Sequence, residues 1–247
     1  MDDLLTAGRI CISPAGAHVT STDTDLGELF YLSSTTGFPI RGGIPVIAPA
    51  FAALLPDAPR HGWARTSDWR VTTDSRGFDA TLVNDGLHLI LIGHELPDGL
   101  RIALTMRNDS GADRVVQAGF HPYFLIDDVR TVRLRGLDGA PVTDRFTGTE
   151  SVQDGEVRVD APFDRIFHSP REVLVDDGRR TLTVASEGAD SIVVWNPGEA
   201  DMQDVGPGEW SQFVCVEPAV LGADLRGVTL PADEELTLAM TVTVSPS

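Results

Sequence analysis

An alternation of apolar and polar residues with a period of two is the feature that most constrains the fold of this chain. In residues 101–107 (RIALTMR), Ile102, Leu104 and Met106 fall on one side, and Arg101 and Thr105 fall on the other. Residues 236–244 (LTLAMTVTV) alternate in the same way, and similar runs return at intervals of roughly 8 to 12 residues. Helical periodicity is scarce, and Gly, Pro and Asp separate the runs. The pattern predicts an all-β protein, either a sandwich or a barrel.

Three further segments refine this expectation. Residues 171–184 (REVLVDDGRRTLTV) are typical of a hairpin that turns near Asp177 and Gly178. Residues 86–96 and 190–197 are apolar at successive positions, which favours strands buried on both faces in stacked sheets. Residues 45–60 (PVIAPAFAALLPDAPR) are too rich in proline for a regular element. We expect a long loop there, and long loops in compact domains are often functional.

The chain has 247 residues, of which 42% are hydrophobic, so it can bury a sizeable core. Neither an internal repeat nor a low-complexity linker divides it. We therefore expect a single domain spanning residues 1–247, and a monomer. The N-terminus carries acids where a signal peptide needs basic residues, and no apolar run approaches the roughly 18 residues of a membrane span. These features favour a cytoplasmic protein, in which Cys11 and Cys215 are two reduced structural thiols.

All 19 basic residues are arginine, and the formal net charge is -18. Without lysine, the chain has no amine for a Schiff base and no P-loop lysine. A strongly acidic surface also repels nucleic acid and anionic membranes. A small molecule is the partner that the composition favours.

Two segments place a histidine in informative surroundings. Residues 60–70 (RHGWARTSDWR) bring His61 and Arg65 close to two tryptophans. Arginine and histidine donate hydrogen bonds to hydroxyls or phosphates, and indole faces suit sugars. A surface turn whose tryptophans fill the core explains the segment equally well. In residues 115–124 (VVQAGFHPYF), alternation puts Gln117, Gly119 and His121 on one face. A histidine placed there can point into a cleft, although a single such residue is more often structural.

Glu217 ends an apolar strand in residues 211–220 (SQFVCVEPAV), where it shares a face with Phe213 and Cys215 and precedes Pro218. The proline is expected to end the ladder of hydrogen bonds. Desolvation of such a carboxylate raises its pKa towards the range of a general base. A strand-end glutamate that reaches solvent or pairs with an arginine is the alternative.

Six short motifs occur in the order found in hexose-6-phosphate mutarotases: RGGIPV at 41–46, HGWAR at 61–65, HPYF at 121–124, DRIF at 164–167, VVWNP at 193–197 and VCVEPA at 214–219. The chain thus resembles the glucose-6-phosphate 1-epimerase branch of the aldose 1-epimerases, in the galactose mutarotase-like superfamily. The resemblance implies a large twisted antiparallel β-sandwich with few short helices, a sugar on its concave face, and a reaction without cofactor or metal.

The resemblance also assigns roles to residues of this chain. Glu217 would be the base that takes the proton of the anomeric hydroxyl, and His121 would be the acid that protonates the ring oxygen. His61 and Asp164 would bind substrate hydroxyls. Arg41 and Arg65 match arginines that bind the substrate, plausibly through its 6-phosphate. Pro122, Tyr123 and Phe124 would fix the strand end and wall the cleft.

This sequence departs from the family pattern in ways that bear on the substrate. Ile47 stands where the family usually has a cysteine or tryptophan, Ala50 stands where it has a tryptophan of the pocket wall, and HPYF replaces the common HTYF. The lysine often found between the fifth and sixth motifs has no counterpart. The interpretation is a hexose mutarotase, with hexose 6-phosphates favoured. Neutral aldoses, or a non-catalytic sugar-binding role, are the alternatives. A glycosidase would need a second carboxylate flanking the bond, and only Glu217 has a supporting motif.

Overall fold

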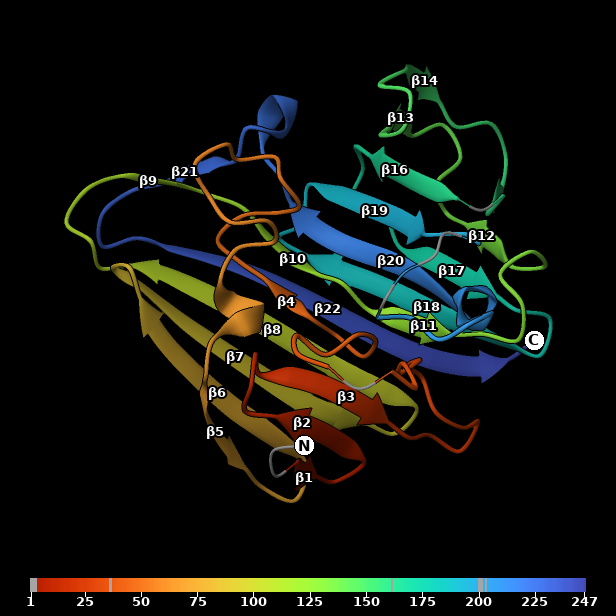
Figure 1. Cartoon of the computed structure of the whole chain (residues 1–247), viewed down its shortest axis with the longest axis horizontal. Helices are drawn as coiled ribbons and strands as arrows, with labels where there is room; N and C mark the ends of the chain where they lie inside the picture. The colour runs from red at the N-terminus through yellow and green to blue at the C-terminus, as the bar shows by residue number, and fades with distance from the viewer. Residues whose placement is uncertain (1–3, 36, 161, 200–201, 203) are drawn as a thin grey trace.

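The structure, a computed structural model, describes residues 4–35, 37–160, 162–199, 202 and 204–247. Its regular structure is nearly all antiparallel strand, which confirms the all-β prediction (Figure 1). Across the described part of the chain the only helices are three short 3-10 helices, η1 (Ala64–Thr66), η2 (Glu209–Gln212) and η3 (Ala223–Leu225). None of them is long or apolar enough to cross a membrane.

A nine-stranded antiparallel sheet forms one layer. Its strands in spatial order are β15 (Val157–Arg158), β12 (Arg133–Arg135), β17 (Val173–Asp176), β18 (Arg180–Glu187), β22 (Glu235–Pro246), β8 (Gly99–Asn108), β7 (Leu87–Leu96), β6 (Gly77–Asn84) and β5 (Arg70–Thr73). In β8, Ile102, Leu104 and Met106 are buried and Arg101 is partly exposed, as the alternation predicts. The hairpin of β17 and β18 turns at residues 177–179, also as predicted.

An eight-stranded antiparallel sheet forms the second layer. Its main path runs through β14 (Glu150–Val152), β13 (Pro141–Asp144), β16 (Phe163–Phe167), β19 (Ser191–Asn196), β20 (Phe213–Val220), β10 (Ala118–Phe120) and β4 (Val46–Ile47), and β11 (Tyr123–Leu125) also pairs with β20. Smaller sheets flank the two layers: β1 (Leu5–Ala7), β2 (Ile10–Ser13) and β3 (His18–Thr22) in one, and β9 (Arg114–Val116) and β21 (Val228–Leu230) in the other.

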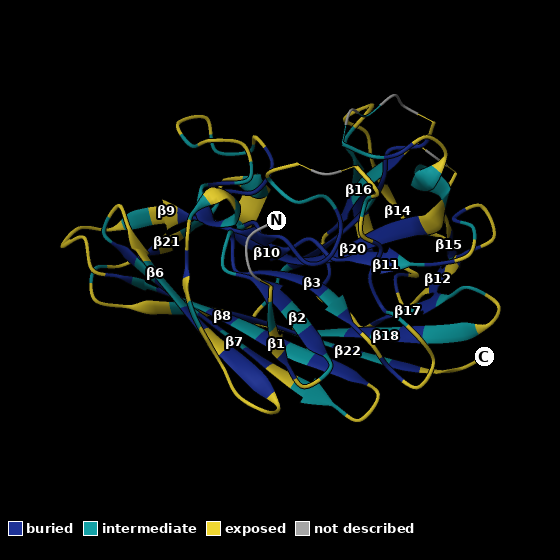
Figure 2. Ribbon diagram, turned by 60° about the horizontal axis from the view of Figure 1, so that its bottom comes forward, coloured by how far each residue is buried: buried dark blue, intermediate teal, exposed yellow. Residues whose placement is uncertain are grey.

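One face of the eight-stranded sheet packs against the nine-stranded sheet to form the main core. Val214 and Val216 of β20 belong to the same buried cluster as Met106 of β8 and Val242 of β22. Figure 2 shows buried segments running through both layers, with exposed residues in the peripheral loops. Because side chains alternate along a strand, the residues between them, such as Cys215, point to the opposite face of the sheet. That second face carries the pocket described below.

Two predictions about individual strands were wrong. Ile90 and Ile92 of β7 are only half buried, because one face of this strand lies outside the core. Pro218 does not end the ladder, since β20 continues to Val220. The carbonyl of Ala219 accepts a hydrogen bond from the Asp190 amide on the β19 side. Successive residues alternate sides, so position 218 faces β10, where it falls opposite Phe120, the last residue of that strand. The missing N–H group therefore affects only the end of the β10 ladder.

β10 and β11 pair with β20 in one continuous register. Gly119 lies opposite Ala219, and Tyr123 lies opposite Cys215. The two residues between these strands leave the ladder without shifting it. His121, halfway between Gly119 and Tyr123, therefore falls opposite Glu217, and both side chains point to the outer face. Its backbone N–H donates to the carbonyl of Pro45, 3.1 Å away.

The proline-rich segment is mostly irregular, as predicted. Apart from the two residues of β4, residues 45–60 form no regular element. Their backbone is held by the sheet, since the Phe51 amide donates to the side chain of Gln117 at 3.0 Å. Gln117 in turn donates to the carbonyls of Leu221 and Leu225. Cys11 and Cys215 are free thiols, as expected.

Candidate functional site

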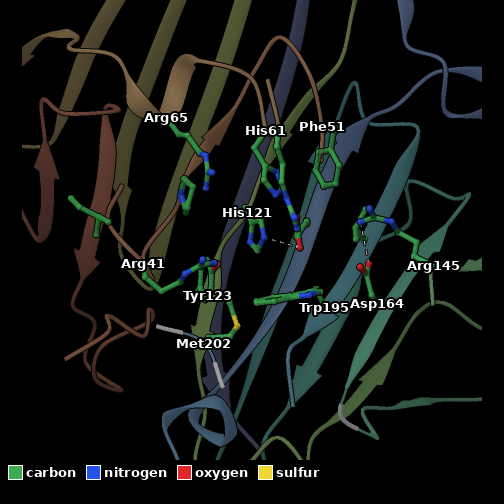
Figure 3. Close-up of a pocket in the computed structure, with 15 residues that line it drawn as sticks. Arg41, Phe51, His61, Arg65, His121, Tyr123, Arg145, Asp164, Trp195 and Met202 are labelled. Atoms are coloured by element: carbon green, nitrogen blue, oxygen red, sulfur yellow. Dashed lines mark hydrogen bonds and ion pairs between the residues drawn. The ribbon is translucent and has the colours of Figure 1, made fainter. Parts of the chain in front are cut away.

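A pocket of about 330 Å³ opens on the outer face of the eight-stranded sheet (Figure 3). All six residues that the sequence singled out line it: Arg41, His61, Arg65, His121, Asp164 and Glu217. They come from distant parts of the chain, since Arg41 and Glu217 are 176 positions apart in the sequence. In Figure 3, Arg41 and Tyr123 lie on one side of His121, and Asp164 and Arg145 lie on the other.

His121 and Glu217 form a buried pair at the floor of this pocket. The Nε2 atom of His121 lies 3.5 Å from Oε1 of Glu217, and their side chains are 10% and 2% exposed. In the described part of the chain, His121 Nδ1 and Glu217 Oε2 have no hydrogen-bond partner. The His121 ring stacks on Tyr123 at 4.9 Å and meets the ring of Trp195 edge-on at 5.6 Å. Aromatic packing thus fixes the imidazole while one polar atom of each residue has no protein partner among the described residues.

Burial determines where the protons of this pair reside. Burial raises the pKa of Glu217 well above its ordinary value, and the nearby carboxylate of Asp164 adds to the effect. Burial lowers the pKa of His121 well below its ordinary value, helped by His61 and by the positive charges of Arg41 and Arg65. Burial therefore favours a neutral carboxyl group beside a neutral imidazole. Beyond the single N–H of the neutral imidazole, the two groups share one exchangeable proton, which either can carry.

His61 acts as a hydrogen-bond donor towards the pocket. Its Nδ1 atom accepts the backbone N–H of Ala52 at 3.3 Å. Burial, together with the positive charges of Arg65 and Arg60, lowers its pKa to about 3. The ring is therefore neutral at pH 7, and its single proton resides on Nε2 because Nδ1 is an acceptor.

The arginines of the pocket differ in their partners. Arg145 donates to Asp164 at 3.3 Å, and burial raises the pKa of that carboxyl group. Arg41 donates to Asp204 and to the hydroxyl of Tyr123. Arg65 makes no ion pair with any described residue, and its buried Nε atom has no hydrogen-bond partner there. Burial, together with the charge of Arg41, lowers its pKa. An uncompensated buried guanidinium is suited to an anionic ligand group.

Residues 60–70 were predicted either to bind a ligand or to form a surface turn whose tryptophans fill the core. Each interpretation holds for some of the residues. His61 and Arg65 line the pocket. Trp69 is buried in the core and donates its indole N–H to the carbonyl of Ala64, and Trp63 packs against the same core from outside. The functional interpretation holds for the polar residues, and the structural one holds for the tryptophans.

One prediction about the HPYF segment needs correction. Tyr123 lines the pocket, but Phe124 points to the core between the sheets, where its ring meets that of Phe30 at 5.7 Å. Gln117 and Gly119 share a strand face with His121, as predicted, without lining the pocket. Gln117 anchors the loop backbone, and Gly119 makes room for Phe51, whose ring carbons would lie 2.8 Å from a Cβ atom at position 119.

Other pocket residues were not predicted as site residues from the sequence. They are Phe51, Arg60, Arg145, Trp195 and Met202, together with Asp204 as a partner of Arg41. Trp195 carried a signal, because it belongs to a quoted motif and alternation places it beside Cys215. Arg145 and Phe51 carried none, since each lies in an irregular segment whose path depends on tertiary contacts.

His121, Cys215 and Glu217 offer potential metal ligands within 4.8 Å of one another. The chemistry of the surroundings does not favour a cation. Burial raises the pKa of the Cys215 thiol well above its ordinary value, so that the thiolate is disfavoured. Arg41 and Arg65 add positive charge to the same pocket. We therefore treat the pair of His121 and Glu217 as an acid and base.

A sequence profile described as aldose 1-epimerase matches residues 6–243, which is nearly the whole chain. The chain belongs to the aldose 1-epimerase family. Membership makes this protein an isomerase of the mutarotase type, whose substrate is a sugar. The expected fold and family resemblance are both confirmed.

Two relatives and two solved structures illustrate the similarity. A protein of Cenchrus ciliaris, provisionally named glucose-6-phosphate 1-epimerase, is 29% identical over 94% of this chain and 80% of its own length. A Haemophilus influenzae protein with the same provisional name is 24% identical over 74% of this chain and 68% of its own. A Salmonella typhimurium structure, provisionally described as a mutarotase, superposes with a TM-score of 0.84 at 24% identity and covers 100% of this chain and 92% of that chain. A galactose mutarotase-like protein of Lactobacillus casei has a TM-score of 0.80 at 17% identity, with 98% and 100% covered.

Proposed function

We propose that this aldose 1-epimerase interconverts the α and β anomers of a hexose 6-phosphate, with Glu217 as general base and His121 as general acid. The observation that carries the proposal is the buried pair of these two residues. They lie opposite each other on one sheet face, 3.5 Å apart, at the floor of the pocket. Each has an unpartnered polar atom among the described residues.

The proposed reaction needs no change in the total number of protons on the pair. The Glu217 carboxylate takes the proton of the anomeric hydroxyl while the His121 imidazolium protonates the ring oxygen, and the C1–O5 bond breaks. Rotation about C1–C2 then presents the other face of the aldehyde. Ring opening leaves Glu217 protonated and His121 neutral, which is the distribution that burial favours. The reverse transfers close the ring on either face and regenerate the starting state.

Several neutral or charged groups would hold the sugar during this cycle. His61 donates from Nε2, and Asp164 accepts from a hydroxyl that approaches Arg145. Trp195 offers an aromatic face beside His121, which suits the C–H face of a pyranose. These groups surround a cavity of about 330 Å³, at the lower end of the usual range for small-molecule sites.

Arg65 is the principal support for the phosphate. Its charge has no acidic partner in the described residues, and Arg41 and Arg60 lie around the same pocket. Two relatives carry names that specify glucose 6-phosphate. A neutral aldose is the second candidate, because Arg41 and Arg145 already have carboxylate partners and add less to an anion site.

The test is the rate of anomeric exchange measured by NMR saturation transfer. Glucose 6-phosphate, glucose and galactose would be compared with the wild type, His121→Asn and Glu217→Gln. We expect each substitution to lower kcat by about 100-fold to 10,000-fold, the usual contribution of a positioned acid or base. A Glu217→Gln enzyme with unchanged kcat would reject the base. Equal acceleration of all three sugars would reject the phosphate preference.

A further inference from the structure

The guanidinium of Arg41 is engaged by two other side chains of the protein. Its Nε atom donates to Oδ2 of Asp204 at 2.9 Å, and Nη2 donates to the same oxygen. Its Nη1 atom donates to the hydroxyl of Tyr123 at 2.6 Å. All three nitrogens thus have partners, and one partner is a carboxylate. An anionic substrate group that approaches Arg41 meets a like charge on the far side of it.

The two carboxylates that pair with pocket arginines lie at different depths. Asp164 is 16% exposed and belongs to a strand, β16. Asp204 is 45% exposed and lies outside regular structure, whereas its partner Arg41 is 21% exposed. The carboxylate at the rim can exchange its arginine for water at little cost, because exposed ion pairs are weak. Asp204 is therefore the partner that an incoming ligand can displace.

Asp204 is not required to hold its segment in place. Glu209 has that role, since its Oε2 atom accepts from the Tyr31 hydroxyl at 2.6 Å and from the amide of Gly206 at 3.0 Å. Arg41 would also keep its contact with Tyr123 if Asp204 lost its charge. A change of Asp204 to its amide thus removes charge with little change in packing.

We propose that Asp204 is an internal counter-ion for Arg41 that sets the preference of the pocket between phosphorylated and neutral sugars. The inference rests on the proposed function and concerns the same site. A phosphate must displace the carboxylate or tolerate its charge. A neutral sugar meets no such repulsion. Asp204 therefore weakens the binding of sugar phosphates and leaves the binding of neutral sugars unaffected.

Asp204→Asn tests the proposal. We expect its KM for glucose 6-phosphate to fall about threefold to tenfold, as expected when one like charge is removed near a surface. The inhibition constant of inorganic phosphate against glucose anomerisation should fall by a similar factor. The KM for glucose should stay the same. Asp127→Asn is the matched control, because it changes net charge equally and removes a carboxylate from an exposed ion pair with Arg179.

The outcomes separate this inference from the proposed function. If Asp204→Asn binds glucose 6-phosphate and inorganic phosphate no more tightly than the wild type, the counter-ion role is wrong even though the enzyme remains a sugar-phosphate epimerase. If Asp127→Asn produces the same gain, the effect is one of net charge and the inference is again wrong. If the wild type ignores phosphate but Asp204→Asn is inhibited by it, the inference stands and the proposed substrate is wrong. If neither enzyme responds to phosphate, both are wrong.

Discussion

The side chain of Glu217 stabilises the folded protein only while it carries a proton. Its folded-state pKa is raised above the ordinary value of 4.5 by burial. For a group of this kind, the contribution to stability is fully present below the unfolded pKa and is lost as the pH rises through the folded pKa. A residue that serves the reaction as a carboxylate is therefore a source of instability at neutral pH, as is common for groups in active sites.

Glu217→Gln should consequently be more stable than the wild type at pH 7, although it is expected to be inactive. The neutral amide keeps the shape and removes the ionisable group from its buried position. A gain of about 1 kcal/mol would raise Tm by roughly 2 to 4 °C in a protein of this size. Thermal unfolding should show no gain at pH 4 and a growing gain above pH 4.5. A uniform loss of stability at all pH values would contradict the assignment.

At the residue scale, the sequence identified the two catalytic candidates and the raised pKa of Glu217, but not the lowered pKa of His121. Alternation alone placed Gln117, Gly119 and His121 on one face, and this face is the correct one. The alternation gave no measure of the burial of His121 or of its distance to Glu217. Both depend on the pairing of strands that are almost a hundred residues apart in the sequence. The side chain of Arg145 could not be placed, because it follows β13 in a turn whose direction is set by contacts with Asp164.

At the scale of elements, β10 positions the proline-rich loop as well as His121. Gly119 leaves space for the ring of Phe51, and Gln117 holds the backbone of the same residue. Phe51 then contacts His61, with ring centroids 5.8 Å apart. The loop and the sheet thus meet at a glycine, which explains why a residue without a side chain lies on an otherwise functional face.

Gly119→Ala should lower kcat/KM by about tenfold or more, since small displacements of positioning groups have large effects. The new methyl group would push the Phe51 ring towards His61 and the pocket. Overpacking should also lower the free energy of unfolding by about 1 to 3 kcal/mol. Activity and urea unfolding would be measured for Gly119→Ala, Phe51→Leu and the double variant. Recovery of activity in the double variant is expected. If the two effects simply add, the glycine does not act through Phe51.

Elements were predicted from the sequence to different degrees. The hairpin at Asp177 and Gly178 and the strand of Ile102 to Met106 were predictable, because local alternation and turn residues determine them. The continuation of β20 through Pro218 was not, since it depends on where the neighbouring strand β10 ends. The loop at 45–60 was predicted as irregular, but only its tertiary contacts show that Phe51 faces the sugar pocket.

For the molecule as a whole, buried histidines make stability sensitive to acid. His18 on β3 donates from Nε2 to the carbonyl of Gly42 at 2.7 Å, directly beside Arg41 in the sequence. Burial lowers its pKa from 6.5 to about 4. A lowered folded pKa gives stability that is fully present above the unfolded value and is lost as the pH falls through the folded one. The same sign applies to His61 and His121.

The free energy of unfolding should therefore decrease between pH 6.5 and pH 4, with His18 contributing roughly 3 kcal/mol. His18→Gln keeps a donor near the Gly42 carbonyl and cannot take up a proton, so its stability should decline less over this range. Urea unfolding at a series of pH values measures the difference. His94→Gln, at an exposed position, is the control. Parallel curves for His18→Gln and the wild type would contradict the prediction.

The eight-stranded sheet and the loops contribute different groups to the pocket. The sheet face carries the proposed acid His121, the proposed base Glu217 and the aromatic floor, whereas arginines from irregular segments and η1 surround the opening. Similar chains at 14% to 24% identity keep the fold. That all of this belongs to one domain remains a prediction. The arrangement allows selectivity to change through the loops while the reacting pair stays in place.

Because β10 and β11 share one register with β20, the facing of His121 and Glu217 depends on whether the number of positions from Gly119 to Tyr123 is even or odd. Tyr123 is four positions after Gly119 in the sequence. Because successive residues of a strand point to opposite faces, this even difference keeps both residues, and His121 between them, on the outer face of the sheet. Deletion or insertion of one residue here would turn His121 into the core and bring Pro122 or Phe120 to the position opposite Glu217. Insertion or deletion of two residues would keep the side chain at the central position on the same face as Glu217. Related chains should therefore vary in length within this segment only by even numbers, whatever sugar they act on.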